Sequence, residues 1–450
     1  MTQQVDLLIE PDWIIPVEPV GRVLDHHALA VHEGRVAALV TREEAREQYR
    51  AEEHLRLPGH ALTPGFVNAH THSPMSLMRG FADDLPLMTW LQEHIWPVEG
   101  KLVGPEFVRD GAELSIAEML LGGTTCFNDM YFFPDVVARS ASRLRIRAVL
   151  GMIVIEFPTP WASEPSEYLR RGLEVRDSFK SDPLLNFAFA PHAPYTVSDD
   201  SFRRLGAYSD ELDTRVHLHL HETVHEVQEA EREHGERPMD RMQRLGLLNP
   251  SMLAVHMTQL TEDEIRRAGE QGISVVHCPE SNLKLASGFC PVSKLQSAGV
   301  NMALGTDGAA SNNDSDMLGE MRSAALLGKA VAEDPAALPA EDVLAMATIN
   351  GARALGLEAE TGSLLPGKWA DLAAIRLDDV ATTPVHNPIS QIVYAAGRDQ
   401  VNHVWVGGRR TVADGRLVEA DESELRGRVD AWKEAIHRAR DEAREAAGNE

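Results

Sequence analysis

Phe66-Val-Asn-Ala-His70-Thr-His72 is a short apolar stretch that ends in two histidines. In an extended strand the two imidazoles point to the same side and can converge on one cation. Among 19 histidines in 450 residues, about one His-x-His is expected by chance, so the pair alone is weak support for a metal site. The pattern in the rest of the chain therefore decides its meaning.

Three further apolar runs end in side chains that can bind a metal. His217-Leu-His219-Leu-His221-Glu222 ends one run, His256 ends another, and Gly305-Thr-Asp307 follows a third. In a parallel α/β barrel the loops after the strands collect catalytic groups. Nitrogen ligands with one carboxylate and a position left open for water are typical of catalytic metal centres. Any one of these histidines could equally be a packed core residue, but the set predicts a metal site.

Residues from about Leu62 to about Leu365 alternate short apolar runs with longer helical patterns, which is the sequence form of repeated βα units. Each expected strand ends in a polar cluster. The expected strands are Ala148–Ile155, Leu185–Ala190, Arg215–Leu220, Ser251–Val255, Ile273–Val276 and Val300–Leu304. This alternation of strand and helix patterns predicts an α/β domain over residues 61–365.

Both ends of the chain have a different, strand-rich texture. Residues 28–40 break at Glu33-Gly34, and residues 404–418 contain two turn dipeptides, as in β-hairpins. We therefore predict one small β-sandwich domain built from residues 1–60 and 366–420. Residues 421–450 predict a packing helix with a single apolar stripe, formed by Leu425, Val429, Trp432 and Ile436.

The composition limits the partners of the protein. Lys and Arg number 43 against 69 Asp and Glu, a formal charge of −26, which argues against a nucleic-acid backbone or an anionic membrane as partner. No stretch approaches the roughly 18 apolar residues of a membrane span, and the first residues lack the features of a secretory signal. Cys126, Cys278 and Cys290 suit a reducing compartment. We expect a cytoplasmic protein with a small-molecule substrate; the sequence leaves open whether it forms a homo-oligomer.

The order of these elements resembles the deaminase branch of the amidohydrolase superfamily. The matching motifs run over essentially the whole chain: Pro64–His72, His219-Leu-His-Glu222, His256 and Gly305–Asn313. Further motifs resemble the 5'-methylthioadenosine/S-adenosylhomocysteine deaminases: Arg79-Gly80, Met88–Leu91, Trp96–Glu99, Pro191–Tyr195 and Pro279–Leu285. The resemblance implies a TIM-type (β/α)8 metallo-hydrolase barrel and a hydrolase that acts on C–N bonds of cyclic amidines.

The same resemblance implies roles for the strand-end residues. One divalent ion, with zinc as the preferred metal, would be held by four ligands: His70, His72, His219 and Asp307. Asp307 and His256 would accept a proton from the water that the metal activates, and Glu222 would protonate the ring nitrogen. His219 is preferred over its neighbours because only it fits the His-x-x-Glu motif; for His217 and His221 we expect packing or support. Since a three-residue offset would face the other way on an ideal strand, the chain must turn before Glu222.

The substrate is the least determined feature. By resemblance, Glu99 would clamp the ribose diol and His192 would contact the ring edge. Family members that accept S-adenosylhomocysteine commonly carry arginines after the third barrel strand, but residues 151–164 contain none. We therefore predict that Met152 and Trp161 contact a methylthio group.

Together these assignments predict a deaminase of 5'-methylthioadenosine, with S-adenosylhomocysteine or adenosine as further substrates. Alternatives are guanine deamination, chloride displacement from a triazine, or a non-catalytic relative on the same scaffold. Met88, Trp90 and Trp96 fit a ligand wall and the protein core equally well.

Overall fold

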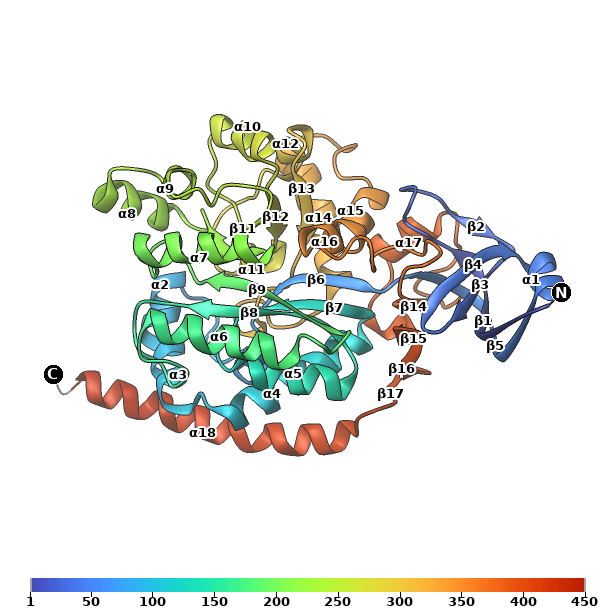
Figure 1. Cartoon of the computed structure of the whole chain (residues 1–450), viewed down its shortest axis with the longest axis horizontal. Helices are drawn as coiled ribbons and strands as arrows, with labels where there is room; N and C mark the ends of the chain where they lie inside the picture. Colours follow the sequence, from blue (N-terminus) through green and yellow to red (C-terminus); the bar gives the residue numbers. More distant parts are fainter. Residues whose placement is uncertain (1, 449–450) are drawn as a thin grey trace.

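The computed structural model describes residues 2–448, and its centre is an eight-stranded parallel barrel (Figure 1). The strands follow one another around the barrel in chain order: β6 (Phe66–Thr71), β7 (Thr124–Asp129), β8 (Arg147–Val154), β9 (Leu185–Pro191), β10 (Val216–Leu220), β11 (Met252–His256), β12 (Ser274–His277) and β13 (Asn301–Leu304). The backbone N–H of Asp307 donates to the carbonyl of His70 at 3.0 Å, which links the two ends of the sheet. All six expected strands are present, with ends shifted by one residue at most, and the barrel prediction is confirmed.

Helices surround the barrel and begin at clear sequence signals. Proline occupies the first turn of α4, α5, α6, α9 and α11, where its missing N–H costs no hydrogen bond. The helices of this part are α4 (Pro105–Leu121), α5 (Pro134–Leu144), α6 (Pro165–Phe179), α7 (Asp199–Leu212), α8 (Val224–His234), α9 (Pro238–Arg244), α10 (Glu262–Gln271), α11 (Pro279–Lys284), α12 (Val292–Ser297), α13 (Ala309–Asn312), α14 (Met317–Ala332), α15 (Ala340–Met346) and α16 (Ile349–Ala354). Their apolar faces form one large core with the strands.

A helical insertion between β6 and α4 supplies one wall of the cavity described below. It consists of η1 (Ser73–Met78), α2 (Leu87–Thr89), the π-helix η2 (Trp90–Ile95) and α3 (Trp96–Leu102). π-helical turns are rare and often occur at functional sites. The insertion therefore lies at the end of the barrel where a functional site is expected.

Strands from both termini form a second, mixed sheet of nine strands beside the barrel (Figure 1). Its strands are β1 (Gln3–Ile14), β2 (Leu24–Asp25), β3 (His27–His32), β4 (Arg35–Thr41), β5 (Tyr49–Pro64), β14 (Leu372–Arg376), β15 (Val401–Val406), β16 (Arg409–Ala413) and β17 (Arg416–Leu417), with the helical segments α1 (Arg42–Gln48), α17 (Pro388–Tyr394) and η3 (Arg398–Gln400) between them. Antiparallel pairing of β5 with β14 joins the two termini. The composite β domain is thus confirmed; its strands share one hydrogen-bonded sheet, and its residue boundaries stay a prediction.

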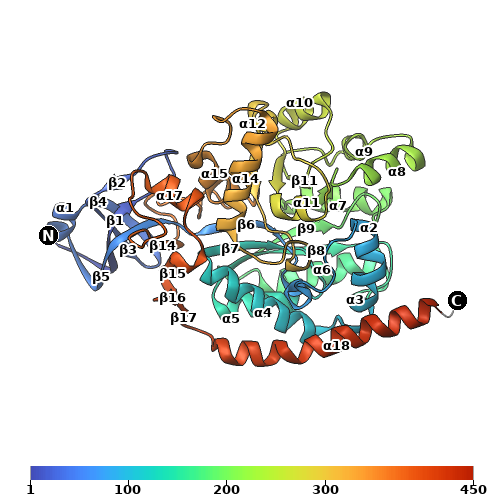
Figure 2. The same cartoon turned by 180° about the vertical axis from the view of Figure 1, so that it is seen from behind.

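The C-terminal helix α18 (Glu422–Gly448) runs along the outside of the barrel, where Figure 2 shows it beneath α3 and α4. Leu425 and Ile436 are buried, and the indole N–H of Trp432 donates to Asp110 at 3.0 Å. The helix therefore packs against α3 and α4. None of the described helices combines the length and the apolar character that crossing a bilayer requires.

A buried ion pair ties the two domains together. Arg147 at the start of β8 donates to Asp371 at 3.0 Å, and both side chains are almost completely buried. Because removing one partner leaves the other charge buried, we expect Arg147→Ala to lower the free energy of unfolding by about 3 to 5 kcal/mol. The exposed pair of Arg139 with Asp135 offers a control, since Arg139→Ala should cost at most about 1 kcal/mol. Urea unfolding of both variants measures the difference, and equal losses would contradict the prediction.

Candidate metal centre and active site

Four of the predicted residues meet at the carboxyl ends of the barrel strands. One ligand atom from each of His70, His72, His219 and Asp307 lies within 4.8 Å of the other three. The Nε2 atoms of His70 and His72 each lie 3.1 Å from Oδ1 of Asp307. Nε2 of His219 lies 3.3 Å from Nε2 of His72. Three imidazole nitrogens and one carboxylate oxygen thus face a common point, as in zinc sites.

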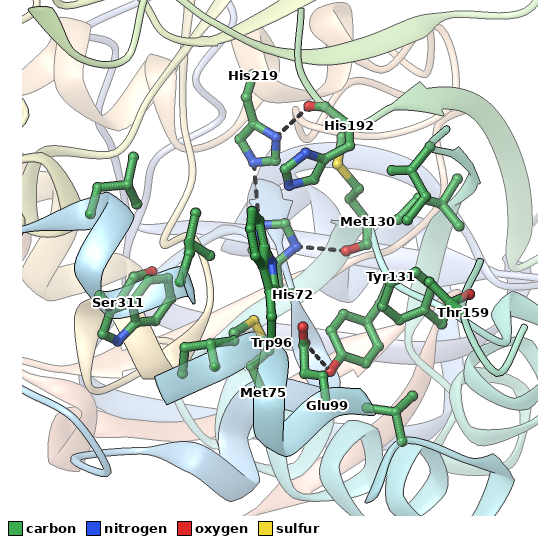
Figure 3. Close-up of a pocket in the computed structure, with 18 of the residues that line it drawn as sticks. His72, Met75, Trp96, Glu99, Met130, Tyr131, Thr159, His192, His219 and Ser311 are labelled. Atoms are coloured by element: carbon green, nitrogen blue, oxygen red, sulfur yellow. Dashed lines mark hydrogen bonds between the residues drawn. The ribbon is translucent and has the colours of Figure 1, made fainter. Parts of the chain in front are cut away.

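The outward-facing nitrogens of these imidazoles are held by hydrogen bonds. Nδ1 of His72 donates to the carbonyl of Met130, and Nδ1 of His219 donates to the carbonyl of His192, both at 2.6 Å (Figure 3). A donating Nδ1 leaves the lone pair on Nε2, which points inward. Burial lowers the pKa of His219 well below its ordinary value, so this imidazole stays neutral. The donor set therefore fits a zinc-type divalent ion.

Asp307 is held firmly by its surroundings. Its Oδ1 accepts the N–H of Gly308 at 2.8 Å, and its Oδ2 accepts the hydroxyls of Ser281 and Ser311 at 2.7 Å each. Burial alone would raise the pKa of Asp307, but the close contacts with His70 and His72 outweigh burial and hold that pKa well below its ordinary value. The carboxylate is therefore ionised and oriented, as a ligand and a proton acceptor both require.

Glu222 reaches the site because the chain turns just before it. Strand β10 ends at Leu220, and His221 takes a left-handed conformation with φ of 53°, which is uncommon for a residue other than glycine. The turn expected from the three-residue offset is thus present. Burial raises the pKa of the Glu222 carboxyl above its ordinary value, so the group keeps its proton to higher pH, as a proton donor requires.

His256 lies next to Glu222 and is also held in place. Its Nε2 is 3.8 Å from the Glu222 carboxylate, and its Nδ1 is 2.9 Å from Oδ1 of Asn282. A donating Nδ1 leaves Nε2 free to accept a proton. Glu222, His256 and the four converging side chains therefore form one group of ionisable residues.

A cavity of about 390 Å³ opens onto this group, a volume suited to a small molecule. Glu99 and His192 also line it, and their contact with the substrate stays a prediction. The hydroxyl of Tyr131 donates to Glu99 at 2.6 Å (Figure 3), and burial raises the pKa of Glu99 to about 7. Trp90 and Trp96 belong to the wall, whereas Met88 does not.

Neither Met152 nor Trp161 lines the cavity, so the structure lends no support to their predicted contact with the substrate, which stays a prediction. Side chains alternate across β8, so Ile153 and Ile155 face the cavity while Met152 packs toward Gly172 of α6. Trp161 packs edge-on against Phe133, with ring centroids 5.2 Å apart.

Three residues support the site: His217, which was expected to pack or to give support, and Asn128 and Tyr131, which lay outside the sequence prediction. His217 places Nε2 at 2.8 Å from Nδ1 of His70, and Asn128 lies 3.1 Å from the other nitrogen of His217. Asn128 and Tyr131 lie at and beyond the end of β7, a strand absent from the prediction. The available signal was the run Thr124–Asp129, which ends in polar residues like the other strands.

Comparison with known proteins adds independent information. A model of the amidohydrolase family matches residues 61–411. A 5-methylthioadenosine/S-adenosylhomocysteine deaminase of Teredinibacter turnerae is 48% identical over 97% of this chain and 98% of its own length. A 5'-deoxyadenosine deaminase of Methanothermobacter thermautotrophicus is 44% identical over 81% of this chain and 84% of its own length.

Solved structures of similar fold include a zinc-bound deaminase and a chlorohydrolase. An adenosine deaminase of Xanthomonas campestris with bound zinc is 51% identical, covers 97% of this chain and 100% of its own, and superposes with a TM-score of 0.96. An atrazine chlorohydrolase of Arthrobacter aurescens reaches a TM-score of 0.86 at 24% identity over 94% of this chain and 99% of its own. At that identity the likeness concerns the fold alone.

Proposed function

The chain belongs to the amidohydrolase family, and from that premise we propose that it is a metal-dependent deaminase of 5'-methylthioadenosine and related adenosine derivatives. Water replaces the 6-amino group, and ammonia leaves. The observation that carries the proposal is one cavity that joins two features. The cavity is lined by three of the four ligands, His72, His219 and Asp307, and by the protonatable Glu222. The buried carboxyl of Glu99 lines it as well.

The side chains divide the work of the reaction between them. A divalent ion held by His70, His72, His219 and Asp307 would lower the pKa of a bound water to about 7. Asp307 and His256 accept the proton of the attacking water. Glu222 gives its proton to the ring nitrogen next to the amino-bearing carbon, which makes that carbon a better electrophile. The C–N bond then breaks as the amino group takes up the proton that Asp307 or His256 accepted and leaves as ammonia, while the hydroxyl proton on the same carbon returns to Glu222.

Glu99 supports a nucleoside rather than a free base. A carboxylate can accept two hydrogen bonds from the vicinal diol of a ribose, whereas guanine and triazines have no such diol. The relatives named as nucleoside deaminases reach 44 to 48% identity, while the triazine hydrolase and guanine deaminase structures share 23 to 25%. A non-catalytic role is disfavoured by the complete set of converging ligands.

A substrate panel tests this proposal directly. Purified, zinc-loaded protein is incubated with 5'-methylthioadenosine, 5'-deoxyadenosine, adenosine, guanine and atrazine, and ammonia or chloride release is measured. We expect ammonia from the adenosine derivatives and no product from guanine or atrazine. Turnover of guanine or atrazine in place of the nucleosides would overturn the proposal.

The 5' substituent finds an apolar surface at the cavity wall. Trp96 of α3 and Phe157 after β8 approach each other with ring centroids 6.1 Å apart, and both line the cavity. We assign to them the contact first predicted for Met152 and Trp161. Arg79 donates to Glu118 at 2.9 Å and does not line the cavity.

We therefore expect kcat/KM for 5'-methylthioadenosine to exceed that for S-adenosylhomocysteine by at least about tenfold, or roughly 1.4 kcal/mol. The zwitterionic homocysteinyl tail of S-adenosylhomocysteine would lose its hydrating water on binding. Among residues 2–448, the cavity wall includes no lysine or arginine that could replace this water as a partner of the carboxylate. Adenosine should fall between or below these two, because it lacks the apolar tail. Equal or better turnover of S-adenosylhomocysteine in side-by-side assays would contradict this order.

Cellular context stays part of the proposal. The acidic net charge and three free, buried cysteines support a cytoplasmic enzyme without nucleic-acid or membrane partners.

A further inference from the structure

Glu226 is a buried carboxylate in the first turn of α8, directly beneath the turn that carries Glu222. Its Oε1 accepts the backbone N–H of His221 at 3.0 Å, and its Oε2 accepts the backbone N–H of Glu222 at 2.7 Å. The residue is 6% exposed. A buried carboxylate is costly unless hydrogen bonds compensate it, so this pair of bonds is a defined feature of the turn.

The local sequence predicts a different arrangement. Thr223-Val-His-Glu226 has the pattern of a capping box, in which the glutamate would bond to the N–H of the capping threonine itself. Thr223 does cap the helix, since its hydroxyl accepts the N–H of Glu226 at 3.2 Å. The Glu226 carboxylate accepts the backbone N–H groups of His221 and Glu222, the two residues before the capping threonine.

The consequence concerns the direction of Glu222. The left-handed His221, with φ of 53°, leaves two successive N–H groups that share one acceptor, the Glu226 carboxylate. On the other side of the same residue, the hydroxyl of Thr258 donates to the carbonyl of Glu222 at 2.7 Å. The main chain of Glu222 is thus held at its nitrogen by Glu226 and at its oxygen by Thr258.

We propose that Glu226 is the positioning residue that aims the Glu222 carboxyl at the substrate ring. The inference rests on the proposed function, because it assumes that Glu222 is the proton donor. Displacing a reacting group by about 1 Å can lower the rate about 10²-fold. Loss of the two hydrogen bonds should therefore lower turnover without changing metal binding.

The test compares Glu226→Gln with Glu233→Gln, a surface substitution near the end of the same helix. The amide keeps one accepting oxygen and turns an N–H group against the other backbone N–H. We expect kcat to fall at least about tenfold while KM stays within about threefold, since the interaction matters mainly in the transition state. Zinc content should match the wild type, and the melting temperature should fall by only a few degrees because one buried backbone N–H loses its acceptor. Glu233→Gln should leave all four quantities unchanged. If the Gln variant does not fold, Glu226→Asp replaces it. This variant must likewise lower kcat while KM stays nearly unchanged.

A double substitution separates positioning from an independent role. If Glu226 acts through Glu222, the variant Glu222→Gln/Glu226→Gln should turn over no more slowly than Glu222→Gln alone. The inference would be overturned if the fold-losses in kcat of the two single variants multiplied in the double variant. It would also be overturned if Glu226→Gln kept the wild-type kcat. Wild-type turnover by Glu222→Gln would instead refute the acid role of Glu222, which distinguishes failure of the proposed function from failure of this inference.

Discussion

Alanine in place of His70, His72, His219 or Asp307 is expected to remove bound metal and deaminase activity together. The four ligand atoms lie within 4.8 Å of one another, and the imidazoles are already oriented by hydrogen bonds to Met130 and His192. Loss of one ligand leaves an incomplete site, and water without a metal returns to its ordinary pKa of about 15.7. We expect turnover to fall by at least about 10³-fold, measured as ammonia release beside metal analysis of the same samples.

Two other histidines serve as controls for this prediction. His225→Ala removes an imidazole that is 58% exposed on α8 and should keep both metal and activity. His217→Ala removes the partner of His70 and should weaken metal binding by roughly 10- to 100-fold, as such supporting residues usually do. Full activity in a metal-free preparation would end the hypothesis.

The metal site could be predicted from two kinds of information. Residues two apart on a strand face one side, which brings His70 and His72 together, and parallel strands end at one edge, where further ligands are expected. The choice of His219 and Asp307 as those ligands came from the resemblance to the amidohydrolases. The direction of Glu222 required one more inference, the turn after β10. The three-residue offset between His219 and Glu222 predicted that turn. The carboxylate of Glu226, which holds the turn, belongs to the following helix. In the sequence its position cannot be distinguished from that of the glutamate in an ordinary capping box.

Which residues of β8 face the cavity could not be predicted, for a physical reason. All eight residues of β8 are buried, because a barrel strand packs against the interior on one face and helices on the other. Such a strand lacks the alternation of apolar and polar residues that identifies its inward face. Met152 was therefore chosen where Ile153 and Ile155 line the cavity, and only the three-dimensional structure brings Trp96 and Phe157 together.

Glu222→Gln is expected to keep the metal and the fold but lower kcat by roughly 10² to 10⁴, the usual contribution of a general acid or base. The amide preserves the shape of the side chain and loses the titrating proton. Because burial raises the pKa of Glu222, the wild-type enzyme should stay active above the ordinary range of a carboxylic acid. Its turnover should then fall as the pH rises through that raised pKa and the proton is lost.

The variant should therefore differ from the wild type in the shape of its pH profile as well as in rate. Residual turnover of Glu222→Gln should lack the decline that deprotonation of Glu222 causes, since no proton is left to lose at that position. Glu229→Gln, a change on α8 at a partly exposed ion pair with Arg232, should keep both the wild-type rate and the decline. Near wild-type turnover by Glu222→Gln would assign the proton donor elsewhere, and His256, whose Nε2 lies 3.8 Å from the Glu222 carboxylate, would be the next residue to replace.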